Sequence, residues 1–383
     1  MELQTQFGPE PPQVLLADDQ RNTIDALELL LKSEGYRIES ASRPSEILAA
    51  VESRRFDVVL MDLNYTRDTT SGGEGLEVLS SIQQKDRTLP LLVMTAWGSV
   101  DLAVEAMRRG ASDFIQKPWE NEQLLSKLKY QIQKRRAQSK ADREYEFELQ
   151  EAREMQRKLF PTKIPQVSGY EIAGSSYPVR FVGGDYFDVA EIGPNRTAIC
   201  IADVVGKGLP AALLLSSLHA ALAPLMAEGV PPRDLCRRLN RILCGITPVG
   251  KFISFFYGVL DSRQNKLVYC NAGHNPPALV RGTHAHRLCA GGTVLGLFGE
   301  ADYEQQEVQL RRGDALLLYT DGVSEAQSAA DDEFGEERLV KVAMENPALD
   351  AGKLQNAIMR EVATHCGGNF HDDATLIVLR AKE

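Results

Sequence analysis

The sequence predicts two domains of different fold class: an α/β domain with a doubly wound parallel sheet, then an α+β domain, joined by a long helix. From residue 13 to about 120, short apolar runs alternate with helical patterns, as in a parallel sheet wrapped by helices. A charged stretch without turn residues follows, and after it apolar runs are separated by glycine and asparagine turns. We therefore place the domains at 13–120 and 163–383, with a helical linker at 121–162.

In the first domain we expect strands at four apolar runs and a helix after the first run. The runs are VLLA (14–17), FDVVLM (56–61), LPLLVMTA (89–96) and DFIQ (113–116), and the helix covers about 22–33. The alternation of these runs with helical patterns indicates a parallel sheet wrapped by helices.

The linker sequence is typical of one helix, which ends at Pro161 and Pro165. Apolar residues recur at spacings of three and four near both of its ends, whereas polar residues occupy its middle. The positions are Leu125, Leu128 and Ile132, then Arg135, Ser139 and Asp142, then Leu149, Ala152 and, through polar Gln156, Leu159. A weak parallel coiled coil, and hence a homodimer, fits this pattern as well as a single solvated helix does.

In the second domain we expect strands at several apolar runs and two helices, at 209–226 and about 232–244. The runs are TAICIA, FFYGVL, KLVYCNAGHNPPALV, DALLLYT and ATLIVL.

Composition excludes several classes of function. A formal net charge of −10 argues against nucleic acid or an anionic membrane as a partner. The six cysteines have no C-x-x-C spacing, which predicts neither a zinc site nor a disulfide framework. We find no signal pattern at the start and no uninterrupted apolar run near the ~18 residues that span a bilayer, so a cytoplasmic protein is expected.

Polar residues follow four predicted strands of the first domain: Asp18 and Asp19, Asp62, Thr95 and Lys117. The carboxyl ends of parallel strands form the ligand-binding edge of such a sheet. Three carboxylates gathered there would repel one another unless a hard cation such as Mg²⁺ joined them. One carboxylate could then attack phosphorus while a lysine and a hydroxyl meet the phosphoryl oxygens.

This constellation closely resembles the receiver domain of two-component response regulators. The resemblance implies a cognate histidine kinase, a phosphoacceptor, a Mg²⁺ site, two residues that read the phosphate and a switch aromatic. Asp62 would be the phosphoacceptor, and Asp18 and Asp19, with the Asn64 carbonyl, would hold the Mg²⁺ ion. Thr95 and Lys117 would contact the phosphate, and Phe114 would be the switch aromatic. One departure is that Thr66 stands where receivers usually carry proline, within the long glycine-rich loop 63–75.

Carboxylates also mark strand ends in the second domain. Asp185 lies in FVGGDYFDV, Asp203 in ADVVGKG, Asp321 in YTDGV, and Asp372 beside Asp373 in HDDAT. No histidine or cysteine accompanies each aspartate at ligand spacing, so Mg²⁺ or Mn²⁺ is favoured over Zn²⁺. Two such ions make a nucleophile from water near neutral pH and stabilise phosphoryl transfer. The pattern predicts a phosphomonoesterase.

In this order the four motifs, together with EMQRKLFP, NAGHNPP and FGEERL, resemble the metal-dependent protein serine/threonine phosphatases of the SpoIIE and RsbU branch. The resemblance covers about 150–383 and implies a β-sandwich flanked by helices with two Mn²⁺ or Mg²⁺ ions. Asp203 would bridge both ions with the Val204 carbonyl nearby, and Asp185 would act through the metal shell. Asp321 and Asp372 would hold the other positions, and the choice of Asp372 over Asp373 follows the family pattern alone.

Three further residues have two interpretations each. Asp188 points away from Asp185 in a regular strand, so we expect it to accept an ordering hydrogen bond. Arg180 could meet substrate phosphate, although a surface ion pair is the more common role. His274, in an Asn/Gly/Pro turn, could be a general acid, although such histidines more often bond their own loop.

The sequence thus indicates a response regulator whose output is a phosphoserine or phosphothreonine protein phosphatase. By resemblance, its substrate is a phosphorylated anti-sigma-factor antagonist in partner-switching control of a sigma factor. The alternative is a non-catalytic adaptor that binds a sigma factor or its regulator under receiver control, against which the presence of all four metal aspartates argues.

Overall fold

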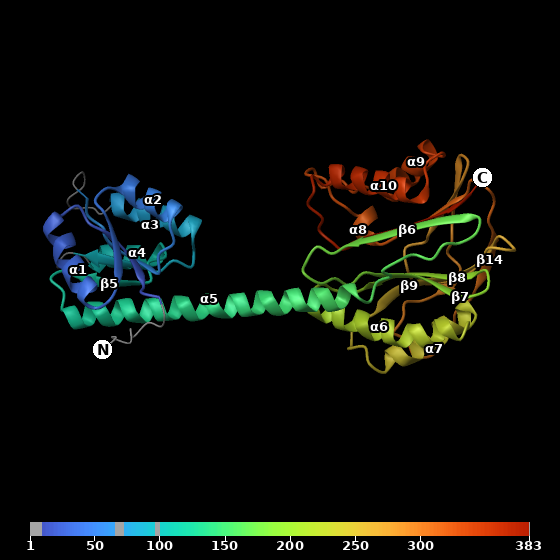
Figure 1. The fold of residues 1–383 in the computed structure, drawn as a ribbon, viewed down its shortest axis with the longest axis horizontal. Helices are drawn as coiled ribbons and strands as arrows, with labels where there is room; N and C mark the ends of the chain where they lie inside the picture. Colours follow the sequence, from blue (N-terminus) through green and yellow to red (C-terminus); the bar gives the residue numbers. More distant parts are fainter. Residues whose placement is uncertain (1–9, 66–72, 96–99, 383) are drawn as a thin grey trace. The chain divides into compact units, whose positions relative to one another are not determined.

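The structure, a computed structural model, describes residues 10–65, 73–95 and 100–382 (Figure 1). The chain divides into two compact units, Met1–Glu146 and Phe147–Glu383.

The first unit is an α/β domain around a five-stranded parallel sheet, in the order β2-β1-β3-β4-β5, as the sequence predicts. The strands are β1 (Gln13–Ala17), β2 (Arg37–Ala41), β3 (Val58–Asp62), β4 (Leu91–Thr95) and β5 (Asp113–Gln116). The helices are α1 (Arg21–Ser33), α2 (Pro44–Ser53), α3 (Gly73–Lys85), α4 (Val100–Arg108) and α5 (Asn121–Arg157).

Both faces of this sheet are buried. Val14 and Leu16 of β1 belong to a core cluster with residues of α1 and α5, while Leu15 and Ala17 belong to a second cluster with residues of α2 and α3. Successive side chains of a strand point to opposite faces, so a strand covered on both sides must be apolar throughout.

Strand β2 is absent from the sequence prediction. Its sequence is RIESA, and among its residues Ala41 alone is fully buried. It pairs with β1 at the edge of the sheet, where polar side chains are tolerated, so apolar patterning gives no signal for it.

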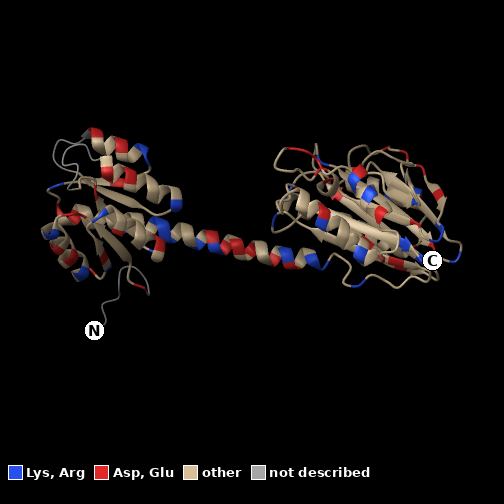
Figure 2. Ribbon diagram, turned by 90° about the horizontal axis from the view of Figure 1, so that it is seen from above, with Lys and Arg blue, Asp and Glu red and all other residues tan. Residues whose placement is uncertain are grey.

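Helix α5 has one use inside the first unit that the linker prediction did not include. Leu124, Leu128 and Ile132 are completely buried in the cluster that contains Val14 and Leu16. Their spacing of four therefore serves the receiver core, and Leu128 and Ile132 are not available to a coiled coil. Farther along, α5 carries a mixture of Lys, Arg, Asp and Glu residues (Figure 2).

The second unit is a sandwich of two mainly antiparallel sheets, in agreement with the predicted fold. One sheet has the order β13-β10-β9-β8-β7 with β14 beside β10, and the other has the order β12-β11-β15-β16-β6. The strands of the first sheet are β7 (Tyr186–Gly193), β8 (Arg196–Val204), β9 (Ile253–Asp261), β10 (Lys266–Ala272), β13 (Gly291–Gly292) and β14 (Gln306–Gln309). Those of the second are β6 (Tyr170–Tyr177), β11 (Ala278–Arg281), β12 (His284–Arg287), β15 (Ala315–Tyr319) and β16 (Ala374–Ala381).

Helices cover the two outer faces of the sandwich (Figure 1). The helices α6 (Leu209–Ala227) and α7 (Pro232–Cys244) pack on the first sheet, and α8 (Asp321–Ser324), α9 (Glu336–Glu345) and α10 (Ala351–His365) pack on the second. A core between the sheets contains Phe187, Ile201 and Phe256 on one side and Leu316 and Ile377 on the other. The three apolar layers fix the sheets so that their strand ends form a defined edge.

Within the described residues, α6 is long and apolar enough to pass a length-and-composition test for a membrane span. The fold gives it another role, because Leu215, Leu218 and Leu222 are completely buried against β8, β9 and β10. It is the central helix of a core cluster.

Candidate functional site

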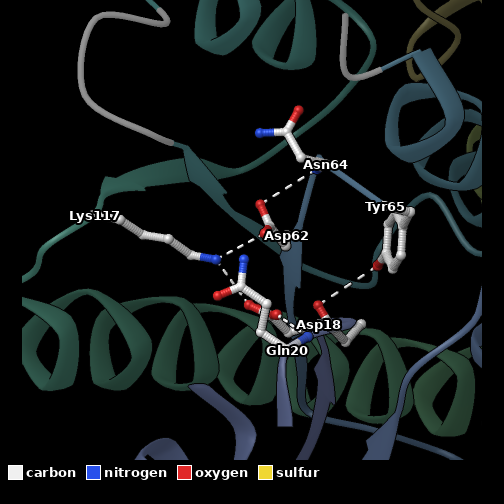
Figure 3. Close-up of polar contacts among 7 residues, drawn as sticks. Asp18, Gln20, Asp62, Asn64, Tyr65 and Lys117 are labelled. Carbon is white, nitrogen blue, oxygen red and sulfur yellow. Dashed lines mark hydrogen bonds and ion pairs between the residues drawn. The ribbon is translucent and has the colours of Figure 1, made fainter. Parts of the chain in front are cut away.

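The first candidate site lies at the carboxyl edge of the parallel sheet (Figure 3). Asp18 follows β1 and Asp62 ends β3, and both are buried. The Lys117 Nζ lies 2.8 Å from the Asp18 Oδ2 and 2.7 Å from the Asp62 Oδ2. One lysine thus contacts both carboxylates, as the sequence pattern predicts for residues at neighbouring strand ends.

Asp19 completes a group of three carboxylates at this edge. Asp18, Asp19 and Asp62 each offer an oxygen within 4.8 Å of the others. Burial is the main cause of the raised pKa of Asp18, although Lys117 and the Gln20 amide act to lower it. Oxygen ligands at this spacing fit a hard divalent cation such as Mg²⁺.

The remaining receiver residues lie at or near the same edge. Thr95 ends β4 and is buried, and its carbonyl oxygen accepts a 2.7 Å hydrogen bond from the Lys117 amide. The backbone amide of Asn64 donates a 3.3 Å hydrogen bond to the Asp62 Oδ1. Phe114 in β5 is 41% exposed, and the Lys127 Nζ lies 5.1 Å from its ring centroid. Thr66 lies outside the described residues.

The second candidate site lies at one edge of the sandwich, where two pairs of antiparallel strands end. Asp185 directly precedes β7, and Asp203 is the penultimate residue of its partner β8. Asp321 follows β15, and Asp372 and Asp373 precede its partner β16. The start of one strand meets the end of its antiparallel neighbour, so segments remote in sequence converge here.

Asp185 is the most deeply buried of these carboxylates. Its Oδ2 accepts a 2.7 Å hydrogen bond from the Thr320 hydroxyl, whereas its Oδ1 has no hydrogen-bond partner among the described residues. Burial, followed by the charge of Asp203, raises the pKa of Asp185 well above its usual value. A buried carboxylate oxygen without a partner is costly, and a bound cation would satisfy it.

Asp203 and Asp321 repel their acidic neighbours. Burial raises the pKa of Asp203 to about 7, and the charges of Asp321 and Asp372 contribute. The pKa of Asp321 is raised by burial and then by Asp372. In the part of the chain that the structure describes, the receiver trio alone brings three such oxygens within 4.8 Å. The all-oxygen chemistry of the sandwich carboxylates fits Mg²⁺ or Mn²⁺.

The two adjacent aspartates differ in environment. Asp372 is half exposed and forms a 2.6 Å ion pair with Lys207. Asp373 is buried, and its two oxygens accept hydrogen bonds from the amides of Val179, at 2.8 Å, and Gly184, at 2.7 Å. With its oxygens so engaged, Asp373 organises backbone, which leaves Asp372 as the better candidate ligand.

Lys207 is a site residue that the sequence analysis missed. Besides Asp372, its Nζ contacts the His371 carbonyl oxygen at 2.7 Å. Its charge offsets only part of the rise that burial causes in the pKa of Asp203 and of Asp321. A lysine between two glycines, four residues after a strand-end aspartate, is the signal that could have identified it.

Asp188, Arg180 and His274 have distinct surroundings. Asp188 accepts from the Val189 amide at 2.8 Å and from the Tyr186 hydroxyl at 3.4 Å, which is the ordering role expected for it. Arg180 is exposed and lies beside Gly208 in the loop after β8.

His274 is buried, and its Nδ1 lies 2.8 Å from the Ser254 hydroxyl. Its backbone amide and carbonyl both bond the Asn271 side chain. Burial lowers its pKa to about 4, so the ring is neutral near pH 7. These contacts favour a structural role for His274 within its own loop.

Comparisons with known families match both units. The response regulator receiver domain model matches residues 14–129, a range that contains all the receiver residues named above. The model of stage II sporulation protein E (SpoIIE) matches residues 193–382, which include Asp203, Asp321 and Asp372 but not Asp185.

A curated relative is the phosphoserine phosphatase RsbU of Bacillus subtilis. It is 32% identical over 242 residues, which cover 62% of this chain and 71% of that protein. Among solved structures, the SiaA-PP2C domain of Pseudomonas aeruginosa aligns with a TM-score of 0.55 at 21% identity, over 63% of this chain and 98% of that one.

The PP2C phosphatase domain of SpoIIE from Bacillus subtilis, solved with a fragment of its regulatory domain, aligns with a TM-score of 0.50 at 22% identity. That alignment covers 57% of this chain and 64% of the solved one. At these identities, both structures show that the second unit has the PP2C fold.

Proposed function

Because this chain belongs to the RsbU and SpoIIE family of PP2C-type protein phosphatases and carries a response regulator receiver domain, we propose that receiver phosphorylation controls its phosphatase activity. The proposed substrate is the phosphoserine or phosphothreonine of an anti-sigma-factor antagonist. Its dephosphorylation would release a sigma factor by partner switching in the cytoplasm.

The convergence of Asp185, Asp203, Asp321 and Asp372 at one edge of the sandwich is the observation that carries this proposal. The raised pKa values of Asp185, Asp203 and Asp321 follow from burial and from repulsion by neighbouring carboxylates, and both effects would be relieved by divalent cations. An adaptor without catalysis would have no need of such a costly cluster.

Asp203 would contact both ions with the Val204 carbonyl nearby, Asp321 and Asp372 would hold further positions, and Asp185 would act through the metal shell. When bound, two Mn²⁺ or Mg²⁺ ions would supply a nucleophile from water and stabilise the charge on the transferred phosphoryl group.

The chain's own residues orient this site and bind the substrate. The Thr320 hydroxyl fixes the carboxylate plane of Asp185 through its Oδ2. Lys207 and Arg180 border the loop after β8 and present positive charge where a phosphate would enter. Arg180 can meet two phosphate oxygens at once, whereas Lys207 supplies a point charge.

In the receiver, Asp62 would accept the phosphoryl group from a cognate histidine kinase, with Mg²⁺ held by Asp18, Asp19 and Asn64. Lys117 contacts the Asp62 carboxylate and would form an ion pair with the phosphoryl group once Asp62 is phosphorylated. Thr95 would supply its hydroxyl to a phosphoryl oxygen. Phe114, which is exposed on β5, would act as the switch aromatic by changing its side-chain position when Asp62 is phosphorylated.

Control of the phosphatase needs an element that both units bias. We assign this role to α5 in a homodimer, in which receiver pairing sets the pairing of the two helices. The pairing would then position α6, which begins six residues after Asp203, and complete the metal site. The buried positions Leu128 and Ile132 confine helix pairing to the part of α5 beyond the receiver core.

The direct test is hydrolysis of an aryl phosphate with Mn²⁺, before and after treatment with an acyl-phosphate donor. We expect Mn²⁺-dependent turnover whose rate changes with receiver phosphorylation. Phosphate labelling of the wild type and its loss in Asp62→Asn would identify the phosphoacceptor. Absence of turnover, together with binding of a sigma factor, would favour the adaptor instead.

A further inference from the structure

The last turn of α5 contacts the glycine pair that precedes Asp185. Gln156 is 9% exposed. Its Nε2 donates a 2.7 Å hydrogen bond to the Gly183 carbonyl oxygen, and its Oε1 accepts a 3.1 Å hydrogen bond from the Gly183 amide. One side-chain amide therefore satisfies both backbone groups of a buried residue, as a neighbouring strand would do.

Two other segments enclose the same glycine pair. The Gly184 amide donates to the Asp373 Oδ2 at 2.7 Å, and the Val204 amide donates to the Gly184 carbonyl oxygen at 3.3 Å. A Cβ on Gly183 would lie 2.5 Å from the Asp373 Oδ2, and one on Gly184 would lie 2.8 Å from the Val204 carbonyl oxygen. The backbone is thus held by α5, by the segment before β16 and by the end of β8, and the next residue is Asp185.

We propose that Gln156 is a positioning residue for the metal site: its contacts with Gly183 hold the backbone that presents Asp185, so metal affinity depends on the last turn of α5. This inference rests on the proposed phosphatase function. The helical spacing of Gln156 suggests a contact with a second α5 helix. Its side-chain amide instead bonds Gly183 of the same chain, and this contact is the basis of the role proposed here.

The surroundings show where the loop can move when the contact is lost. A cavity of about 520 Å³ lies beside Gln156, and Phe160, Gly183 and Asp185 contribute to its wall. Leucine or methionine at position 156 preserves bulk but offers Gly183 neither donor nor acceptor, which leaves two buried backbone groups without partners. A shift of the loop toward the cavity would let solvent satisfy these two groups, and Asp185 would shift with the loop.

The experiment measures Mn²⁺ binding by the full chain, with Asp203→Asn as the blank that reports Mn²⁺ bound elsewhere, including at the receiver. Gln156→Leu and Gln156→Met should each weaken Mn²⁺ binding at the phosphatase site about 10-fold or more, the usual effect of losing a residue that orients a ligand. At saturating Mn²⁺, the KM for an aryl phosphate should stay within about twofold of wild type. The matched control is Arg153→Gln, which changes the same cavity wall and should leave Mn²⁺ affinity unchanged, because within the described residues Gln156 is the side chain that bonds the Gly183 backbone.

Wild-type Mn²⁺ affinity in either folded Gln156 variant would overturn the inference, as would an equal loss in Arg153→Gln. The two apolar variants differ in shape, so failure of one to fold leaves the other to decide. If the wild type itself binds no more Mn²⁺ than Asp203→Asn and hydrolyses no phosphate ester, the proposed function fails, whatever the Gln156 variants do.

Discussion

The carboxylate of Asp203 is held in an unfavourable state by its neighbours. Burial and the charges of Asp321 and Asp372 raise its pKa to about 7, and Lys207 compensates only in part. A site with this much repulsion is costly for folding and favourable for binding cations, because ions of opposite charge convert the repulsion into attraction.

Asp203→Asn should therefore separate activity from stability. Removing one of the like charges should abolish Mn²⁺-dependent phosphatase activity while leaving the melting temperature in chelator at or above that of wild type. Steady-state kinetics and calorimetry measure the two effects, and receiver phosphorylation serves as the internal control. Wild-type activity in this variant, or strong wild-type activity with chelator present, would refute the site assignment.

A second residue pair makes the first unit sensitive to acid. Burial acts to raise the pKa of Asp57, but hydrogen bonds from Arg136 at 2.8 and 3.0 Å and from the Gln13 amide at 2.8 Å prevail and lower it. A lowered folded-state pKa stabilises the fold above the unfolded value of about 4, and this contribution is lost as pH falls through the folded value.

Asp57→Asn should accordingly destabilise the first unit by about 1–2 kcal/mol at pH 7. The difference from wild type should shrink as pH falls below about 4, because the wild-type carboxylate becomes protonated as pH falls through its lowered folded-state pKa. Calorimetry at pH 7, 5 and 3 compares the two proteins. A difference of the same size at every pH would mean that packing, not the ion pair, accounts for it.

At the residue scale, the sequence indicates the convergence of charged side chains that directly follow strands, but it gave no indication of side chains that reach a site from a loop or a helix. The receiver carboxylates and Lys117 follow strands directly, so their convergence could be expected from strand order. Lys207 and Gln156 contact the second site through hydrogen bonds to residues 165 and 27 positions away. Sequence spacing carries no information about such pairs.

Among the elements, α5 shows how one spacing can have two explanations. Leucines at intervals of three and four are typical of a coiled-coil seam, but they also describe any helix that packs on a sheet. In the first unit the second explanation is correct, because Leu128 and Ile132 are buried in the receiver core. Periodicity identifies an apolar face and not its partner.

Leu128→Ala distinguishes these roles. Because Leu128 is fully buried, its truncation should destabilise the first unit by about 2–5 kcal/mol, which lowers the melting temperature by at least roughly 4 °C. The control is Tyr130→Ala, two residues away at a side chain that is 61% exposed, which should change it little. An unchanged melting temperature with a weaker dimer would instead return Leu128 to an intermolecular seam.

Other elements could be predicted where their apolar patterns are strong, but the expectation of two helices in the second unit was incomplete, because it missed α8, α9 and α10. The expected helix 209–226 is α6, Leu209–Ala227, and the helix at about 232–244 is α7, Pro232–Cys244. Short, polar strands gave no such signal. Strand β12 has the sequence HAHR, and all four of its residues are exposed. Both β2 and β12 lie at sheet edges, where hydrogen bonds to one neighbouring strand, and not burial, stabilise the strand.

At the scale of the whole molecule, the proposed control depends on the phase of α5. Inserting seven residues near Ser139 preserves the phase of a heptad seam, whereas inserting two rotates the downstream half by about 200°. The seven-residue insert should keep the effect of receiver phosphorylation on phosphatase rate, and the two-residue insert should lose it. Phosphatase assays with and without acyl-phosphate donor, with light scattering for oligomeric state, provide the measurement.

Equal regulation in both inserts would show that α5 is a passive tether. A monomer before and after phosphorylation would also reject helix pairing, and would leave direct contact between the domains as the route of control.

The burial of α6 has a consequence for how this protein is made. Its leucines become covered only when β9, β10 and residues as late as Leu295 and Tyr303 have been synthesised. At about 5–20 residues per second, a ribosome needs roughly 4–15 s to travel from Ala227 to Tyr303. Throughout that interval the emerging chain displays a helix whose composition would suit a lipid bilayer. We therefore expect a chain truncated before Ile253 to aggregate, and chaperones that bind nascent apolar helices to reduce that aggregation.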